Sequence, residues 1–514
     1  MAEFRQATSG AIVAEALVLN LTPPSKIGTG ICFLDHMVDQ FTSHGMLGVT
    51  LRCGVVGKSA GDAAAAEPEA AGGTKFFAPL KDYATGLSGR PYDRDIFAAC
   101  GTALGLALRR VVDEVAAGLP ADAAPGSSAA VFCSPLDESF AEASVDLRPP
   151  AENTGRCVTA LEPYGLHCGS ATGRRWIGRY RTEHTPVFWE SLATALGGDI
   201  SLKKIRGGNA HHQLESTFKA FARAFRAALD CMVDPTGSHG CAAAGAGPLA
   251  LAPEPPTEPR RAERRRATKE TTIEVRIDLD APWAAEDEPT GAETVWTEGT
   301  KIPSQIIASV EKTQRIKTGI DVLDRVLTQF SQAAGIEIVV HCEGDRHIDD
   351  HHTAEDVAIT LGQCFYEALG EKKGCQRMGC AEGAHGGSRV RAVLDLSNRP
   401  HFESNLPLDE ENVGAVEYEF DGVQPADGDA PSPWDALCGN VLSCEMLFHV
   451  YNSLTLEMRS SCHLELIEDS GATGHTLDLA LAAANAYGAA VSRAIRVDPR
   501  RQGKVASSKG TLSK

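Results

Sequence analysis

The chain lacks the features that would place it in a membrane or on nucleic acid. Its 514 residues contain no apolar run of the roughly 18 residues that a spanning helix needs, so no membrane span is expected. The formal net charge of −19 argues against nucleic acid as a partner, because binding to phosphate backbones requires clustered lysine and arginine. The one basic run, residues 260–269, falls in a predicted linker and is interpreted as a solvated tether. We therefore expect neither a membrane nor a nucleic-acid partner.

Signals for export and for oxidative folding are also missing. The 15 cysteines form no C-x-x-C pair, which fits reduced, packed thiols better than a disulfide framework. The first ten residues are too poor in apolar side chains for a signal peptide. A transit peptide has little support, because recognisable domain sequence begins within about 30 residues of the start. We expect a cytoplasmic protein, with a plastid as the alternative compartment.

What the chain does contain is an ordered internal repeat. Residues 29–41 (T-G-I-C-F-L-D-H-M-V-D-Q-F) match residues 318–330 (T-G-I-D-V-L-D-R-V-L-T-Q-F), and both patterns predict an amphipathic helix after a glycine. Two further pairs follow in the same order: 95–104 with 356–365, and 143–147 with 392–396. Chance similarity would not preserve this order, so the sequence predicts a tandem duplication.

Low-complexity sequence separates the two halves. Residues 235–268 include C-A-A-A-G-A-G-P and P-E-P-P-T-E-P, which bury too little surface to fold, and they are predicted to link domains 1–234 and 269–514. Inserts near 55–83, 284–300 and 426–433 are expected to be surface loops. Each half mixes strand patterns, such as 273–279, with helix patterns, such as 218–226. This mixture predicts an α+β fold with helices packed on one side of each sheet.

Two histidine–acid clusters give the strongest functional signal. Both have the form H-H-x-x-E, with His211, His212 and Glu215 in the first half and His351, His352 and Glu355 in the second. A carboxylate one helical turn after adjacent histidines can reach the same ion, and this donor set suits manganese, iron or zinc. Either cluster alone could equally be structural zinc or a satisfied core pair. Asp349 and Asp350, which precede His351, are predicted to orient the imidazoles.

These motifs resemble those of the imidazoleglycerol-phosphate dehydratases, enzymes of histidine biosynthesis. The matching runs are F-L-D-H-M at 33–37, G-N-A-H-H-Q-L-E-S-T-F-K-A-F-A-R-A at 208–224, H-I-D-D-H-H-T-A-E-D at 347–356, L-D-L-S-N-R-P at 394–400 and S-S-K-G at 507–510. The resemblance covers nearly all of the chain outside the linker and inserts, and it occurs twice, once in each half. It implies two tandem dehydratase-like domains, each of two sheet–helix repeats with the ribosomal protein S5 domain 2-like fold. It also implies a large homo-oligomeric shell.

The resemblance further implies two manganese ions, Mn2+, each held by three histidines and one glutamate. Each of the eight ligand positions is filled once per chain, which predicts a composite site built from both halves. One ion would take His36, His211, His352 and Glu355, and the other would take His212, Glu215, His351 and His449. At the matching positions of the other half, where the ligand is missing, stand residues such as Arg94, Val187 and Arg325. An arginine beside a divalent cation is electrostatically unfavourable, so the two sites that would use these other positions are expected to be inactive. Whether the halves meet within one chain or between chains is left open.

The substrate residues implied by the resemblance are divided in the same way. Glu270 is the predicted acid/base, and His44 is a second catalytic candidate whose alternative role is helix capping or packing. A phosphate dianion would be bound by Arg377, Arg399, Ser507, Ser508 and Lys509, with help from Lys219. The first half keeps the segment P-L-D-E at 135–138, where the second half has G-A-H-G-G-S.

The expected activity is dehydration of D-erythro-imidazole glycerol phosphate to imidazole acetol phosphate plus water. The metal would act as Lewis acid and template. The alternative is a catalytically dead metal-binding or scaffold descendant of the same family. A binuclear phosphatase is disfavoured, because such sites are richer in aspartate and the chain has no D-x-D-G-T motif.

Overall fold

The computed structural model divides the chain into two compact units. Unit 1 comprises Met1–Glu254, Lys373–Gln376 and Val497–Lys514, and unit 2 comprises Pro255–Lys372 and Arg377–Arg496. The residues that the structure describes are 4–10, 12–21, 25–56, 77–79, 93–118, 128–147, 155–166, 171–233, 259–282, 315–346, 348–410, 412–413, 442–469, 475–501, 503–507 and 512.

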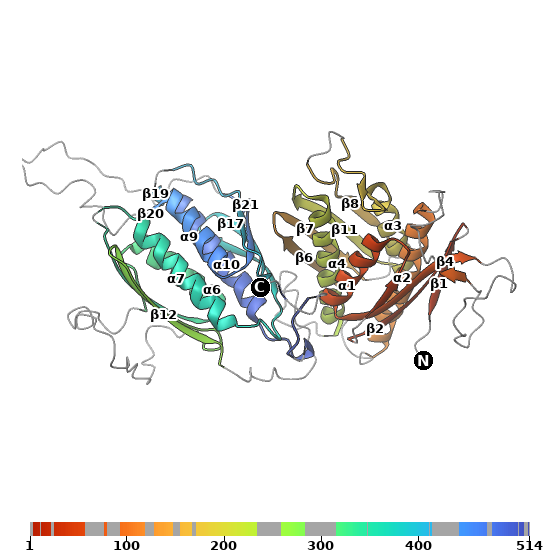
Figure 1. Cartoon of the computed structure of the whole chain (residues 1–514), viewed down its shortest axis with the longest axis horizontal. Coiled ribbons are helices and arrows are strands. Elements are labelled where there is room, and N and C mark those ends of the chain that lie inside the picture. Colours follow the sequence, from red (N-terminus) through yellow and green to blue (C-terminus); the bar gives the residue numbers. More distant parts are fainter. Residues whose placement is uncertain are drawn as a thin grey trace, which may run out of the picture. The chain divides into compact units, whose positions relative to one another are not determined.

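Unit 1 contains two sheets with helices packed between them (Figure 1). The first sheet has the order β1 (Arg5–Ser9), β2 (Ile12–Asn20), β4 (Leu47–Val56), β3 (Lys26–Gly28), with β5 (Phe77–Pro79) also on β4. The second has the order β6 (Ala129–Leu136), β7 (Ser139–Asp146), β11 (Asp199–Arg206), β8 (Cys157–Ala160). The helices are α1 (Cys32–Gly45), α2 (Asp93–Ala117), α3 (Thr185–Leu196) and α4 (Ala210–Val233). A small hairpin, β9 (Trp176–Ile177) with β10 (Tyr180–Arg181), precedes α3.

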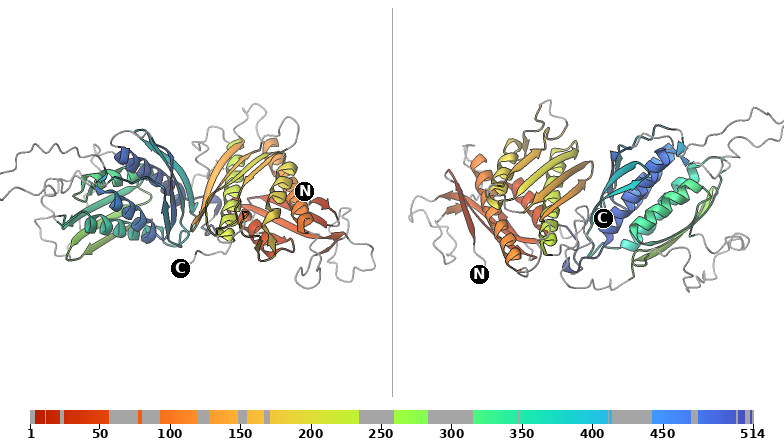
Figure 2. Two further views of the ribbon diagram at one scale, coloured as in Figure 1. Left: turned by 90° about the horizontal axis from the view of Figure 1, so that it is seen from above. Right: turned by 180° about the vertical axis from the view of Figure 1, so that it is seen from behind.

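Unit 2 repeats the strand order of both main sheets, again with helices packed on them (Figure 2). Its first sheet has the order β12 (Arg261–Ala267), β13 (Thr271–Asp278), β15 (Glu337–Gly344), β14 (Ile316–Lys317), and its second has the order β16 (Met378–His385), β17 (Ser388–Asp395), β21 (Ser461–Glu468), β18 (His401–Ser404). The helices are α6 (Asp321–Ala334), α7 (His351–Leu369), α9 (Cys444–Glu457) and α10 (His475–Ile495), and a short pair joins β19 (Asn412–Val413) to β20 (Leu442–Ser443). In all four main sheets the last strand pairs in parallel and the others pair antiparallel.

The two units also repeat local details. Thr29 donates its backbone N–H and its hydroxyl to Asp35 ahead of α1, at 2.8 and 2.5 Å, and Thr318 does the same to Asp324 ahead of α6, at 2.7 and 2.6 Å. These bonds tie the segment before each helix to the first turn, although neither N-cap residue, Ile31 or Ile320, makes a side-chain cap bond. The helices predicted at 29–41 and 318–330 are confirmed, as is the strand predicted at 273–279. The α+β class is therefore confirmed.

Two features differ from the sequence predictions. The basic run is not a tether: Arg261–Ala267 form the edge strand β12, which pairs with β13 from Arg261↔Asp278 to Ala267↔Thr272. Its arginines bind acidic neighbours, as Arg266 does with Asp356 at 2.7 Å, and charged side chains are common on edge strands. Within the predicted insert 55–83, β5 pairs with β4. The inserts at 284–300 and 426–433 lie outside the described residues.

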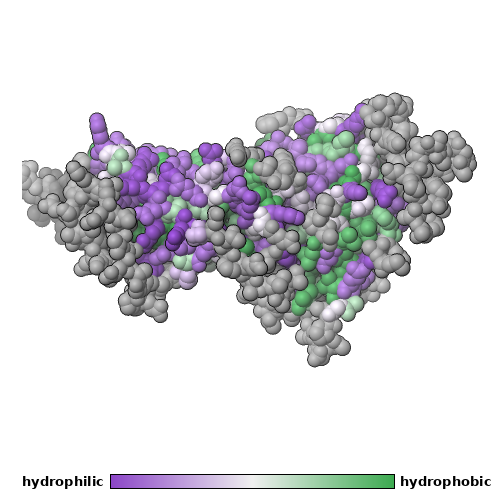
Figure 3. Space-filling model, turned by 60° about the horizontal axis from the view of Figure 1, so that its bottom comes forward, coloured by the Kyte–Doolittle hydropathy of each residue, from purple (hydrophilic) through white to green (hydrophobic). Residues whose placement is uncertain are grey.

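The outer surface is mixed in polarity. In the face shown in Figure 3, hydrophobic and hydrophilic residues alternate over unit 1, and the described residues of unit 2 are mostly hydrophilic. Among the described helices, none is long and apolar enough to cross a membrane.

Candidate metal centre

Three predicted ligands meet in unit 1 where α1 lies beside α4 (Figure 1). His36 comes from α1, and His211 and Glu215 lie one turn apart on α4. The Nε2 atoms of His36 and His211 lie 3.5 and 3.2 Å from Glu215 Oε2. One donor atom from each of the three residues lies within 4.8 Å of the others, which is the spacing that a single ion requires. Packing of Phe41 on Phe221 fixes the two helices against each other.

A buried lysine holds the carboxylate of this cluster. Lys219 is 2% exposed, and its Nζ lies 2.7 Å from Glu215 Oε1. Burial opposes ionisation of Glu215, but the charge of Lys219 and the hydrogen bonds from His211, His36 and Lys219 outweigh it and hold the Glu215 pKa far below its usual range. The carboxylate therefore binds Lys219 through one oxygen and presents the other to the two imidazoles.

A second cluster lies in unit 2 where α7 contacts α9. Glu355 Oε1 lies 2.9 Å from His449 Nε2, and Glu355 Oε2 lies 3.5 Å from His351 Nε2. The hydrogen bond from His449 is the main cause that lowers the Glu355 pKa. One turn after Glu355 stands Ile359, so no lysine occupies the place that Lys219 has in unit 1. Both oxygens of this carboxylate face histidines.

The other two predicted ligands each bind a carboxylate through Nδ1. His212 Nδ1 lies 2.9 Å from Glu138 Oε2, and His352 Nδ1 lies 3.1 Å from Asp345 Oδ2. The hydrogen bond that His352 donates to Asp345 is the largest cause that raises the His352 pKa. Metal-binding histidines typically donate their second ring N–H to such a carboxylate, which orients the ring and leaves Nε2 for the ion.

The predicted orienting residues were therefore wrong. Asp349 accepts the backbone N–H of His351 at 3.0 Å, and Asp350 accepts the backbone N–H of Ser443 at 2.6 Å. These carboxylates bind main-chain N–H groups at the starts of α7 and α9, and the imidazole partner is Asp345 in the loop that precedes α7. The sequence held one signal for Glu138, since the segment P-L-D-E at 135–138 occurs only in the half that carries His212.

The two catalytic candidates occupy different environments. Glu270 is exposed in the turn between β12 and β13, where its carbonyl accepts the N–H of Asp345 at 3.1 Å and its charge contributes to raising the His352 pKa. His44 is buried near the end of α1, eight residues after His36, which places it about 12 Å further along the helix axis. This position matches the packing alternative for His44.

The predicted phosphate residues are spread over both units. The buried guanidinium of Arg377 forms two bonds to Asp395, at 2.6 and 2.7 Å. Arg399 is half-buried after β17, and Ser507 is half-buried in the C-terminal segment of unit 1. Lys219 is committed to Glu215, and Ser508 and Lys509 lie outside the described residues.

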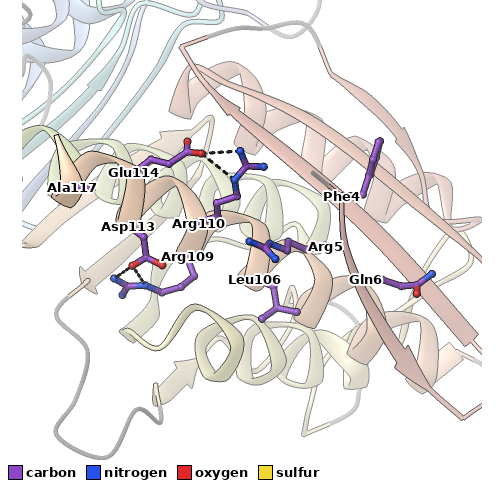
Figure 4. Close-up of a pocket in the computed structure, with 9 residues that line it drawn as sticks. All are labelled: Phe4, Arg5, Gln6, Leu106, Arg109, Arg110, Asp113, Glu114 and Ala117. Carbon is purple, nitrogen blue, oxygen red and sulfur yellow. Dashed lines mark hydrogen bonds and ion pairs between the residues drawn. The ribbon is translucent and has the colours of Figure 1, made fainter. Parts of the chain in front are cut away.

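A cavity of about 680 Å³ lies elsewhere, between the start of β1 and the last turns of α2 (Figure 4). None of the predicted site residues lines it. Its two α2 arginines already bind acids one turn on, Arg109 with Asp113 at 2.5 Å and Arg110 with Glu114 at 2.8 Å. The histidine clusters, and not this cavity, form the candidate site.

Comparison with known proteins matches the chain to one enzyme family. The family model described as imidazoleglycerol-phosphate dehydratase matches residues 95–225 and 318–422. The enzyme of that name from Cereibacter sphaeroides is 33% identical over 253 residues, which are 49% of this chain and 100% of that protein. The one from Pyricularia oryzae is 34% identical over 255 residues, which are 50% of this chain and 98% of that protein. The crystal structure of the Staphylococcus aureus subsp. aureus N315 enzyme matches at 20% identity and a TM-score of 0.29, over 44% of this chain and 96% of that one. The chain belongs to the imidazoleglycerol-phosphate dehydratase family.

Proposed function

We propose that the chain is a hydro-lyase that converts D-erythro-imidazole glycerol phosphate to imidazole acetol phosphate and water. The observation that carries this proposal is the pair of His–His–Glu clusters, one in each unit, with two further histidines oriented by carboxylates. Family membership supports the reaction class, because the relatives that match half of the chain carry the name of this dehydratase.

The donor set fits manganese. Six imidazoles and two carboxylates suit a first-row divalent ion, and the spacing within each cluster suits binding of one ion. We propose that the eight ligands hold two Mn2+ ions in a composite site, with three histidines and one glutamate per ion. When bound, the metal would polarise the substrate imidazole and stabilise the charge that develops on it. The resemblance predicts which ligands go to which ion, and it assigns Glu215 to a different ion from His36 and His211. That assignment stays a prediction.

The remaining chemistry is assigned to polar groups around the ligands. Glu270 would move the proton from the carbon beside the imidazole ring as the hydroxyl leaves, since its exposed turn adjoins Asp345 and His352. Arg399, Ser507 and the predicted Ser508 and Lys509 would bind the phosphate. Arg377 would act through Asp395, or would need to exchange that partner for phosphate.

The distribution of ligands supports a division of labour between duplicated halves. Both units have the same strand order, yet each carries ligands that the other lacks. Drift in a scaffold protein would not keep each of the eight positions once, so nothing favours the catalytically dead alternative. We further propose that the chain assembles as a large homo-oligomer, in which composite sites couple assembly to metal loading.

Turnover of imidazole glycerol phosphate with added manganese tests this proposal. We expect His36→Ala and His352→Ala each to lose turnover and bound metal, and His385→Ala to retain both, because His385 pairs with Asp478 outside either cluster. Rescue on mixing the two inactive variants would show that halves of different chains meet. Two bound manganese ions without any turnover in the wild-type chain would establish the scaffold alternative instead.

A further inference from the structure

The C-terminal end of α4 carries charged side chains in the interior of unit 1. Arg223 is 3% exposed, Arg226 is 5% exposed and Asp230 is nearly buried. Buried charges are costly unless they are paired and hydrogen-bonded. At this end of α4, Arg226 Nε pairs with Asp230 Oδ1 at 3.1 Å, and Arg226 Nη1 donates to Asn20 Oδ1 on β2 at 2.7 Å. Further partners come from segments distant in the sequence.

One of these segments is the chain's C-terminal tail, defined as residues 497–507. Arg500 Nη1 donates to Asp230 Oδ2 at 3.0 Å, and its Nε donates to Asp498 Oδ1 at 2.9 Å. Gln376 donates to Asp498 Oδ2 at 2.8 Å and accepts from Arg223 Nη1 at 2.9 Å. The bonds thus run from Arg226 through Asp230, Arg500, Asp498 and Gln376 back to Arg223 on α4.

Backbone contacts join the tail to the segment that contains Gln376. Asp498 N–H donates to the Gly374 carbonyl at 2.8 Å, and Gly374 N–H donates to the Lys504 carbonyl at 3.0 Å. Cys375 and Val497 form an isolated antiparallel bridge. These two short segments come from the second half of the sequence, yet both belong to unit 1.

The sequence shows that this pairing occurs once per chain. After α4 the chain reads Asp-Pro-Thr at 234–236, and after α10 it reads Asp-Pro-Arg at 498–500. Counted back from the shared Asp-Pro, the charged positions of α4 correspond on α10 to Tyr487, Ala490 and Ala494. The first half therefore has the charged helix without the arginine tail, and the second half has the tail without the charged helix.

We propose that residues 497–507 are a docking segment for the C-terminal end of α4, and that the second half thereby completes the core of the first. The inference does not depend on the catalytic proposal, because the network lies apart from the metal ligands. If the chain is a catalyst, docking of the tail would place Ser507, a predicted phosphate-binding residue, in unit 1.

Limited trypsin digestion of the full chain tests the docking, because Arg500, Arg501 and Lys504 are cleavage sites within the tail. Asp230→Asn removes the α4 partner and leaves these sites unchanged. We expect cleavage within the tail to accelerate about tenfold or more, since proteolysis follows the population of the opened state. Asp113→Asn, an exposed acid paired with Arg109 on α2, is the matched control and should digest like the wild type.

A second variant covers the case in which Asp230→Asn does not fold. Arg500→Gln acts from the tail side, with cleavage counted after Arg501 and Lys504 only. We expect it to accelerate cleavage to a similar extent, and the double variant to digest no faster than either single one, because both break the same interaction. Tail cleavage in Asp230→Asn or Arg500→Gln that is as slow as in Asp113→Asn would overturn the proposal.

Discussion

Replacing Glu215 with glutamine should destabilise unit 1 even when no metal is bound. The substitution removes the carboxylate that lies 2.7 Å from the Lys219 ammonium and leaves that ammonium 2% exposed with its main counter-charge gone. Breaking one side of a buried ion pair costs about 3–5 kcal/mol. We expect a loss of that size in the free energy of unfolding, measured by urea titration with a chelator present and followed through the fluorescence of buried Trp189.

Two variants separate this effect from a general loss of charge. Glu114→Gln removes a carboxylate that is 57% exposed and paired with Arg110, so it should cost at most about 1 kcal/mol. In Glu215→Gln/Lys219→Met the buried ammonium is also removed, and most of the lost stability should return. If Glu215→Gln costs no more than Glu114→Gln, or if the double variant is as unstable as Glu215→Gln alone, the reasoning about this pair is wrong.

Three further predictions concern other parts of the chain. Asp345→Asn should weaken manganese binding about 10- to 100-fold in calorimetry, because a neutral amide orients the imidazole less well; unchanged affinity would contradict the orienting role. Burial opposes ionisation of Asp498, but the hydrogen bonds and charge of Arg500 outweigh burial and lower the Asp498 pKa. The ionised Asp498 therefore stabilises the fold above its unfolded pKa of about 3.9, and this contribution is lost as pH falls through the lower folded pKa. The protection factors of the tail amides in hydrogen exchange should therefore hold at pH 5 and fall only below about pH 4. Gly105→Ala should cost about 1–3 kcal/mol in thermal unfolding, because the new methyl group meets an α3 carbonyl, whereas Gly28→Ala meets nothing and should be close to neutral.

Several elements could be predicted from the sequence because their signals are local. The helices that follow Thr29 and Thr318 show their apolar spacing within about 13 residues, and both form as predicted. Histidines with an acid one turn on are candidate ligands by type and spacing, and the structure places His211 with Glu215 and His351 with Glu355. The order of matching segments predicted two similar halves, and the strand order is the same in both units.

Other features depended on contacts between residues far apart in the sequence. The run at 260–269 has the composition of a linker, but pairing with β13 makes most of it a strand. Composition gives no information about which strand will accept an edge partner, and spacing did not show that His352 would bind Asp345 rather than the acids beside it.

The sequence by itself determined which side chains can bind a metal and that the chain is built from two similar halves, because chemical type and helical spacing are properties of neighbouring residues. Only the tertiary structure decided which carboxylates orient those ligands and that the C-terminal tail binds α4. The tail pairing joins Arg500 to Asp230, 270 positions apart, and both side chains are nearly buried, so leaving either charge unpaired would be costly.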